Sequence, residues 1–156
     1  MKKWIVYLLA LAAIPVLSYG GFGGEDIGKL APVEAVLLRT EENNIQLLTD
    51  SGQLGEGKTP VTAIEDLSAT SSTRVFLDTA EYMLLEPGTE AFLPQLQKYL
   101  RPSCSLCNIS GEIDPAAAAK YLQLHQPELT LAQYEAGERQ LPTLIIYEGR
   151  MKLVRP

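Results

Sequence analysis

The sequence is short of cationic side chains, cysteine and histidine, and each shortage excludes a class of function. Its 156 residues hold 13 Lys and Arg against 19 Asp and Glu. Such an acidic body repels phosphate backbones, so we expect no nucleic-acid partner. Two cysteines and one histidine, His125, supply at most three ligands, which predicts no metal site. No carboxylate pair stands out for acid–base chemistry, and no cofactor is expected.

Repeats are also missing. The sequence has no internal repeat, no low-complexity tract and no G-X-Y period. An apolar share of 46% excludes a wholly disordered chain. The length fits one globular domain.

The first twenty residues follow the pattern of an export signal. Lys2 and Lys3 precede an apolar run over 4–17, and Ser18 and Gly20 are the small residues before a cut. About 14–16 apolar residues are fewer than the roughly 20 of a membrane span, although an uncleaved N-terminal anchor is the alternative. No cysteine follows the run, which excludes a lipidated N-terminus. Removal of Lys2 and Lys3 would change the net charge from −6 to −8.

These features predict three segments. Residues 1–20 are a signal peptide or anchor, residues 21–32 are a flexible leader, and residues 33–156 are a single domain. The leader begins in a stretch with four glycines among residues 20–24. We expect the domain to be extracytoplasmic, either secreted or tethered to the membrane by the N-terminal segment.

Apolar spacing and breaker residues predict an α/β or α+β domain with about three helices packed on a single mixed sheet. Thr59, Thr89 and Asp114 are expected N-caps, with Pro60 and Pro115 at the first helical position of two of the helices. Expected strands are 33–40 and 45–49 as a hairpin, then 74–78, 82–85 and 103–110, with a C-terminal hairpin over 144–147 and 151–154. Expected helices follow Thr59 for about ten residues, then cover 89–100 and 116–124, with a short helix or loop at 131–134. Residues 51–58 are expected to form a loop.

A phosphate-loop pattern lies between the first hairpin and the first helix. Gly52, Gly57, Lys58 and Thr59 match G-x-x-x-x-G-K-[ST]. In a working loop, the lysine and threonine belong to the first helical turn, whose amides bind phosphate. Pro60 disfavours helical geometry at Thr59, and Glu56 would place a carboxylate in the anion site. We interpret the match as a decoy and expect no bound nucleotide.

Cys104 and Cys107 form a CxxC pair, the spacing that thiol–disulfide enzymes use to activate a thiolate at a helix N-terminus. The strand around Leu141-Pro142-Thr143 resembles the proline-bearing strand of thioredoxin-like proteins. However, Arg101-Pro102 ends a helix just before Cys104, and the next N-cap is Asp114. If 103–110 is a turn, a small disulfide is possible. If it is a strand, the cysteines lie ~10 Å apart, beyond the ~7 Å limit for a bridge, and are buried apolar groups.

A broader resemblance spans about residues 25–122. It rests on loose glycine and apolar motifs at 25–30, 33–35, 55–59, 63–67, 75–85 and 99–102. This order resembles the N-terminal domain of the C subunit of spore germinant receptors, the Ger(x)C family. The chain would be a stand-alone relative without the lipid-accepting cysteine. The resemblance implies an exported, non-catalytic α/β domain that acts with membrane partners in germination.

The sequence therefore favours a binding or scaffold domain of the cell envelope. We expect this domain to have no catalytic residues and to bind a protein partner at the membrane or cell envelope. The alternative is a thioredoxin-like thiol–disulfide oxidoreductase that uses Cys104 and Cys107.

Overall fold

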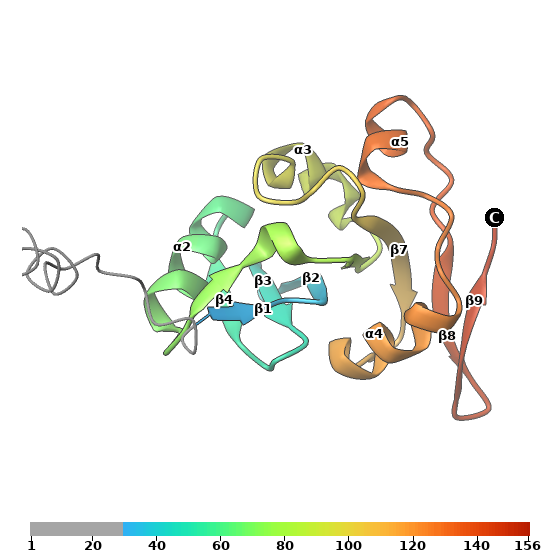
Figure 1. The fold of residues 1–156 in the computed structure, drawn as a ribbon, viewed down its shortest axis with the longest axis horizontal. Helices are drawn as coiled ribbons and strands as arrows, with labels where there is room; N and C mark the ends of the chain where they lie inside the picture. Colours follow the sequence, from blue (N-terminus) through green and yellow to red (C-terminus); the bar gives the residue numbers. More distant parts are fainter. Residues whose placement is uncertain (1–29) are drawn as a thin grey trace, which may run out of the picture.

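The computed structural model describes residues 30–156, which form a mixed seven-stranded sheet with helices on both faces (Figure 1). The strand order is β4-β3-β2-β6-β7-β8-β9. The strands are β2 Ala35–Glu41, β3 Asn44–Thr49, β4 Leu54–Gly57, β6 Tyr82–Leu85, β7 Ser105–Ser110, β8 Thr143–Tyr147 and β9 Arg150–Val154. The helices are α2 Pro60–Thr70, α3 Leu93–Leu96, α4 Pro115–Leu124 and α5 Leu131–Glu135. The predicted fold class is confirmed.

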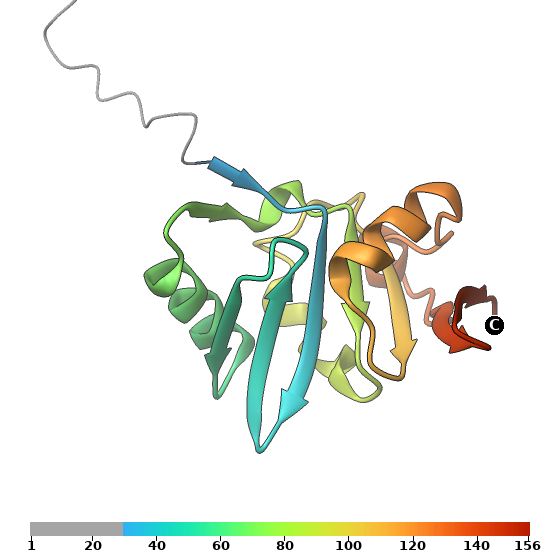
Figure 2. The ribbon, with the colours of Figure 1, turned by 90° about the horizontal axis from the view of Figure 1, so that it is seen from below.

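Strands β2, β6, β7 and β8 are parallel, so their carboxyl ends meet at one edge, the lower edge in Figure 2. Antiparallel partners complete the sheet: β3 and β4 beside β2, and β9 beside β8. Both predicted hairpins are confirmed. Their two-residue turns, Glu42-Asn43 and Glu148-Gly149, have positive φ at both positions, as expected of tight hairpin turns.

The sheet separates two apolar cores. Alternate residues of a strand face opposite sides, and in β2 Val36 and Leu38 enter one core whereas Ala35 and Leu37 enter the other. The first core contains buried residues of α2, α3 and α5, and the second contains those of α4. The helices after β6 and β7 therefore cover opposite faces of the sheet.

Two predicted helix starts are confirmed. The Thr59 hydroxyl accepts a hydrogen bond from the Thr62 amide at 3.2 Å, and the Asp114 carboxylate accepts one from the Ala117 amide at 3.1 Å. Pro60 and Pro115 occupy the first helical position, where a missing N–H costs nothing.

The third predicted cap, Thr89, is wrong. Gly88 precedes a 3₁₀ turn, η3 Thr89–Phe92, and α3 is a single turn rather than a helix that reaches residue 100. The Thr89 hydroxyl donates back to the Glu86 carbonyl at 2.7 Å instead of capping forward amides. A hydroxyl that closes a local turn competes in this way with helix capping.

Three further expectations needed correction. Residues 51–58 are not only a loop, because β4 adds an edge strand there. The strand expected at 74–78 ends at Phe76 as β5 Arg74–Phe76 and continues as a 3₁₀ turn, η2 Leu77–Thr79. The end of the expected leader forms β1 Leu30–Pro32, which pairs in parallel with β5 as a separate two-stranded sheet.

The expected signal or anchor and most of the leader lie outside the described residues. Within residues 30–156, no helix is long and apolar enough to cross a membrane.

Candidate functional site

The residues of the phosphate-loop match have structural roles. Gly52 lies in a turn at φ +80, and Gly57 ends β4, which is antiparallel to β3. Thr59 has an extended backbone, and its hydroxyl is engaged in a capping box with Thr62. Lys58 is exposed. No first helical turn contains both Lys58 and Thr59, so the geometry does not form a phosphate cradle.

Close packing explains the glycines of β4. A Cβ on Gly55 would lie 2.8 Å from the Leu67 backbone nitrogen, and it would also overlap the Ala63 carbonyl oxygen. A Cβ on Gly57 would lie 2.6 Å from the Ala63 nitrogen. Helix α2 therefore lies directly against the backbone of β4, which only glycine permits.

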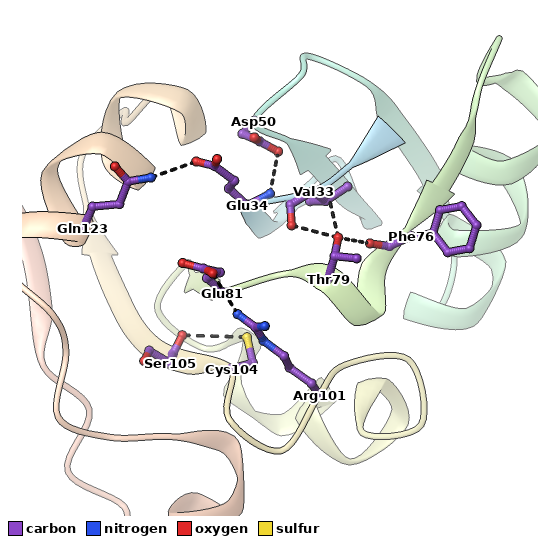
Figure 3. A network of polar contacts seen from close by, with 10 residues as sticks. All are labelled: Val33, Glu34, Asp50, Phe76, Thr79, Glu81, Arg101, Cys104, Ser105 and Gln123. Carbon is purple, nitrogen blue, oxygen red and sulfur yellow. Dashed lines mark hydrogen bonds and ion pairs between the residues drawn. The ribbon is translucent and has the colours of Figure 1, made fainter. Parts of the chain in front are cut away.

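The two cysteines are free, fully buried and on opposite faces of the sheet. Cys104 directly precedes β7 and enters the first core, whereas Cys107 lies within β7 and enters the second. Burial raises the pKa of each thiol to about 12. Arg101 lies beside Cys104 and is paired with Glu81 at 3.2 Å (Figure 3). Its charge lowers the pKa of Cys104, but burial outweighs it.

No helix begins at Cys104, so no helix dipole favours its thiolate. The sequence left two conformations open for residues 103–110, a turn or a strand. The structure has the strand, and the thiols pack as small apolar groups. The activated CxxC nucleophile that the thioredoxin-like alternative requires therefore has no structural counterpart here.

His125 is the C-cap of α4. Its Nδ1 is 3.1 Å from the Tyr121 carbonyl oxygen, and its ring stacks on Tyr121 with centroids 4.2 Å apart. Across residues 30–156, no group of three or more His, Cys, Asp or Glu residues is arranged to hold a metal ion.

The amino edge of the parallel strands is closed by internal contacts (Figure 3). The Gln123 side chain donates to the Glu34 carboxylate at 3.1 Å, which ties α4 to the start of β2. The Val33 amide donates to the Thr79 hydroxyl at 2.8 Å, and that hydroxyl donates to the Phe76 carbonyl at 2.7 Å. These polar groups hold the connections before β2 and β6.

The opposite, carboxyl edge carries a cleft of about 730 Å³. The cleft lies at the ends of β6 and β7. From β6 the chain passes to α3 on one face of the sheet, and from β7 it passes to α4 on the other face. Crevices at such points are the usual ligand sites of open α/β sheets. The lining residues are Leu37, Arg39, Leu48, Glu86, Pro87, 109–113, Asp114 and Pro115.

The charged side chains of this cleft are mostly acidic. Arg39 donates from Nε to the Gln46 side chain at 2.6 Å and pairs with Glu41 at 3.4 Å, so its charge is already balanced. Glu86 accepts a hydrogen bond from the Thr40 amide at 2.8 Å. Glu112 is exposed and makes no hydrogen bond or ion pair within residues 30–156. The lining thus combines apolar side chains with three carboxylates, of which Glu112 is the one without an internal hydrogen bond among the described residues.

Sequence reasoning did not find this cleft. Its residues come from β2, β3 and the loops after β6 and β7, which are distant in the chain. The only local signals are Glu86-Pro87 and the stretch from Gly111 to Pro115, each a polar break after a strand.

Among the described residues that line the cleft, no hydrogen bond pairs the Ser110 hydroxyl with a carboxylate base. Comparison with family models, curated proteins and solved structures finds no match to this chain.

Proposed function

We propose that this chain is a non-catalytic binding domain of the cell envelope, and that its carboxyl-edge cleft binds a short basic and apolar segment of a protein partner. The observation that carries the proposal is the cleft itself, whose lining combines apolar side chains with three carboxylates, Glu86, Glu112 and Asp114, and with one cation, Arg39, that is already paired. Its place at the carboxyl ends of parallel strands is where α/β folds bind ligands.

The chemistry of the cleft defines the partner segment. Leu37, Ile109 and Ile113 belong to the second core and are at most 5% exposed, so the accessible apolar surface of the cleft comes mainly from half-buried Leu48 and exposed Pro87. Glu112 and Asp114 line the same cleft from the loop before α4. A segment that alternates cationic with apolar side chains would complement both the carboxylates and the apolar lining of the cleft. Charge complementarity would fix its orientation, and apolar contact would add affinity.

Binding is favoured over turnover by the state of the thiols. A redox enzyme needs an accessible thiolate, whereas Cys104 and Cys107 are buried and face different cores. The thioredoxin-like alternative predicts insulin reduction that disappears in the Cys104→Ser, Cys107→Ser variant. The binding proposal predicts no such activity.

The location and biological setting rest on the sequence. The export-like residues 1–20 favour an extracytoplasmic domain, and the resemblance to the Ger(x)C family favours a role in spore germination with a membrane-associated partner. These remain proposals.

Peptide binding tests the proposed function. The probe is a short labelled peptide that alternates lysine with leucine, and we expect a Kd on the order of 10 μM by fluorescence anisotropy. Glu112→Lys should weaken binding by about tenfold or more, and added salt should weaken it for the unaltered chain. A matched control is Glu65→Lys, an exposed acid on α2.

Equal affinity for a peptide that alternates glutamate with leucine would contradict the proposal. So would equal effects of Glu112→Lys and Glu65→Lys.

A further inference from the structure

The hairpin of β8 and β9 extends past the carboxyl edge of its neighbour. Ser110, the last residue of β7, pairs with Ile145, whereas β8 continues to Tyr147 and then turns. Two further residues of strand add about 7 Å. Figure 1 shows the hairpin running below the end of β7. We name residues 146–151 the hairpin tip.

The hairpin tip has apolar side chains on both faces. Ile146 lies on the face of α4, and Tyr147 lies on the opposite face, because successive residues alternate. They are 47% and 61% exposed. The α4 face of the tip is partly covered, because Met151 packs against the second core, whereas the opposite face leaves Tyr147 exposed.

The hairpin carries two basic residues, Arg150 and Lys152, and one acidic residue, Glu148, in a chain whose net charge is −6. A third basic residue, Arg155, follows β9. Arg155 pairs with Glu128 at 2.9 Å. Arg150 and Lys152 are exposed and form no ion pair within residues 30–156.

Two features protect this sheet edge from strand addition. Basic residues often prevent strand addition at an exposed edge. Here the outward Leu153 amide already donates to the Tyr121 hydroxyl at 3.2 Å, which blocks the edge at that position.

We propose that the occupant of the cleft is a second copy of this chain, whose hairpin tip enters it in a reciprocal, two-fold dimer. This inference rests on the proposed function, because it names the partner of the same cleft. The tip offers Tyr147 to the accessible apolar lining, Leu48 and Pro87, and it offers unpaired Arg150 to unpaired Glu112. Tip and cleft lie on the same edge of one molecule, so one two-fold axis satisfies both contacts at once.

Sedimentation velocity of the full chain, at about 1–100 μM, tests the dimer. We expect a monomer–dimer equilibrium that shifts to monomer with added salt. Arg150→Glu alone and Glu112→Lys alone should each weaken association by about tenfold or more. The chain that carries both substitutions should regain the dimer, because the two exchanged charges again form an opposite pair across the interface.

The matched control is Lys58→Glu, an exposed basic residue beside β4, at the other edge of the sheet. It should leave the dimer unchanged, and circular dichroism should show that all four variants are folded. A chain that stays monomeric at low salt would overturn the inference. So would association without rescue in the double variant, or growth beyond a dimer.

The two proposals can fail separately. Peptide binding by a monomeric chain supports the binding cleft and overturns the dimer. A rescued dimer that binds no lysine–leucine peptide supports the dimer and contradicts the broader partner class.

Discussion

Replacement of Gly55 by alanine should test the packing role of the β4 glycines. The new Cβ would lie 2.5 Å from the Leu67 Cβ and 2.8 Å from the Leu67 nitrogen, well inside ordinary contact. Both neighbours belong to α2, so a single side chain cannot rotate away. The helix itself must move from the sheet.

The cost follows from that movement. Overpacking a buried site costs about 1–3 kcal/mol, and displacement of buried Ala63 and Leu67 places this variant at the upper end, near 3 kcal/mol. Gly52→Ala is the matched control. Gly52 has φ +80 and open space around a Cβ, so its replacement should cost only about 1 kcal/mol of backbone strain.

Urea unfolding followed by circular dichroism measures both free energies. Gly55→Ala should be less stable than Gly52→Ala by about 2 kcal/mol. Equal stabilities would refute the packing argument. Stabilisation of the unaltered chain by Mg-ATP, lost in Lys58→Ala, would instead restore the phosphate-loop interpretation.

Two further predictions concern the thiols and the sheet edge. The pKa of Cys104 and Cys107 is raised to about 12 in the fold, whereas an unfolded thiol titrates near 9, so unfolding releases protons between these values. The free energy of unfolding should therefore be unaffected by the thiols below pH 9 and fall above it, by about 1.4 kcal/mol per pH unit per thiol. The double variant Cys104→Ala, Cys107→Ala should flatten this fall of the unfolding free energy with pH. Identical slopes for the variant and the unaltered chain would contradict the raised pKa of the thiols. Tyr121→Phe removes the acceptor of the Leu153 amide and should cost about 1 kcal/mol. Hydrogen exchange at Leu153 should accelerate, and unchanged exchange would show that this hydrogen bond does not protect the edge.

Much of the fold could be predicted because its signals are local. Pro60 and Pro115 with their preceding cap residues indicate two helix starts, and Glu42-Asn43 and Glu148-Gly149 allow the positive φ of tight turns. Apolar runs on either side of these turns then specify strands.

The errors arose where distant contacts decide the structure. Leu54-Gly55-Glu56-Gly57 has little strand propensity, yet it becomes β4 because β3 offers an open edge and α2 packs closely on glycine. The cap at Thr89 failed because its hydroxyl closes a local turn. The cleft could not be predicted, since its residues meet only when β3, β2, β6 and β7 lie side by side in the sheet.

The partition of the apolar interior has a consequence for how the protein opens. Each central strand contributes side chains to both cores, so neither layer of helices can detach without exposing a sheet face. Loss of α4 would uncover one side of β2, β3 and β6, and loss of α2 would uncover the other side of β3 and β4. The backbone amides of β2, β6 and β7 should therefore be the last to exchange with solvent, and the domain should melt in a single cooperative step.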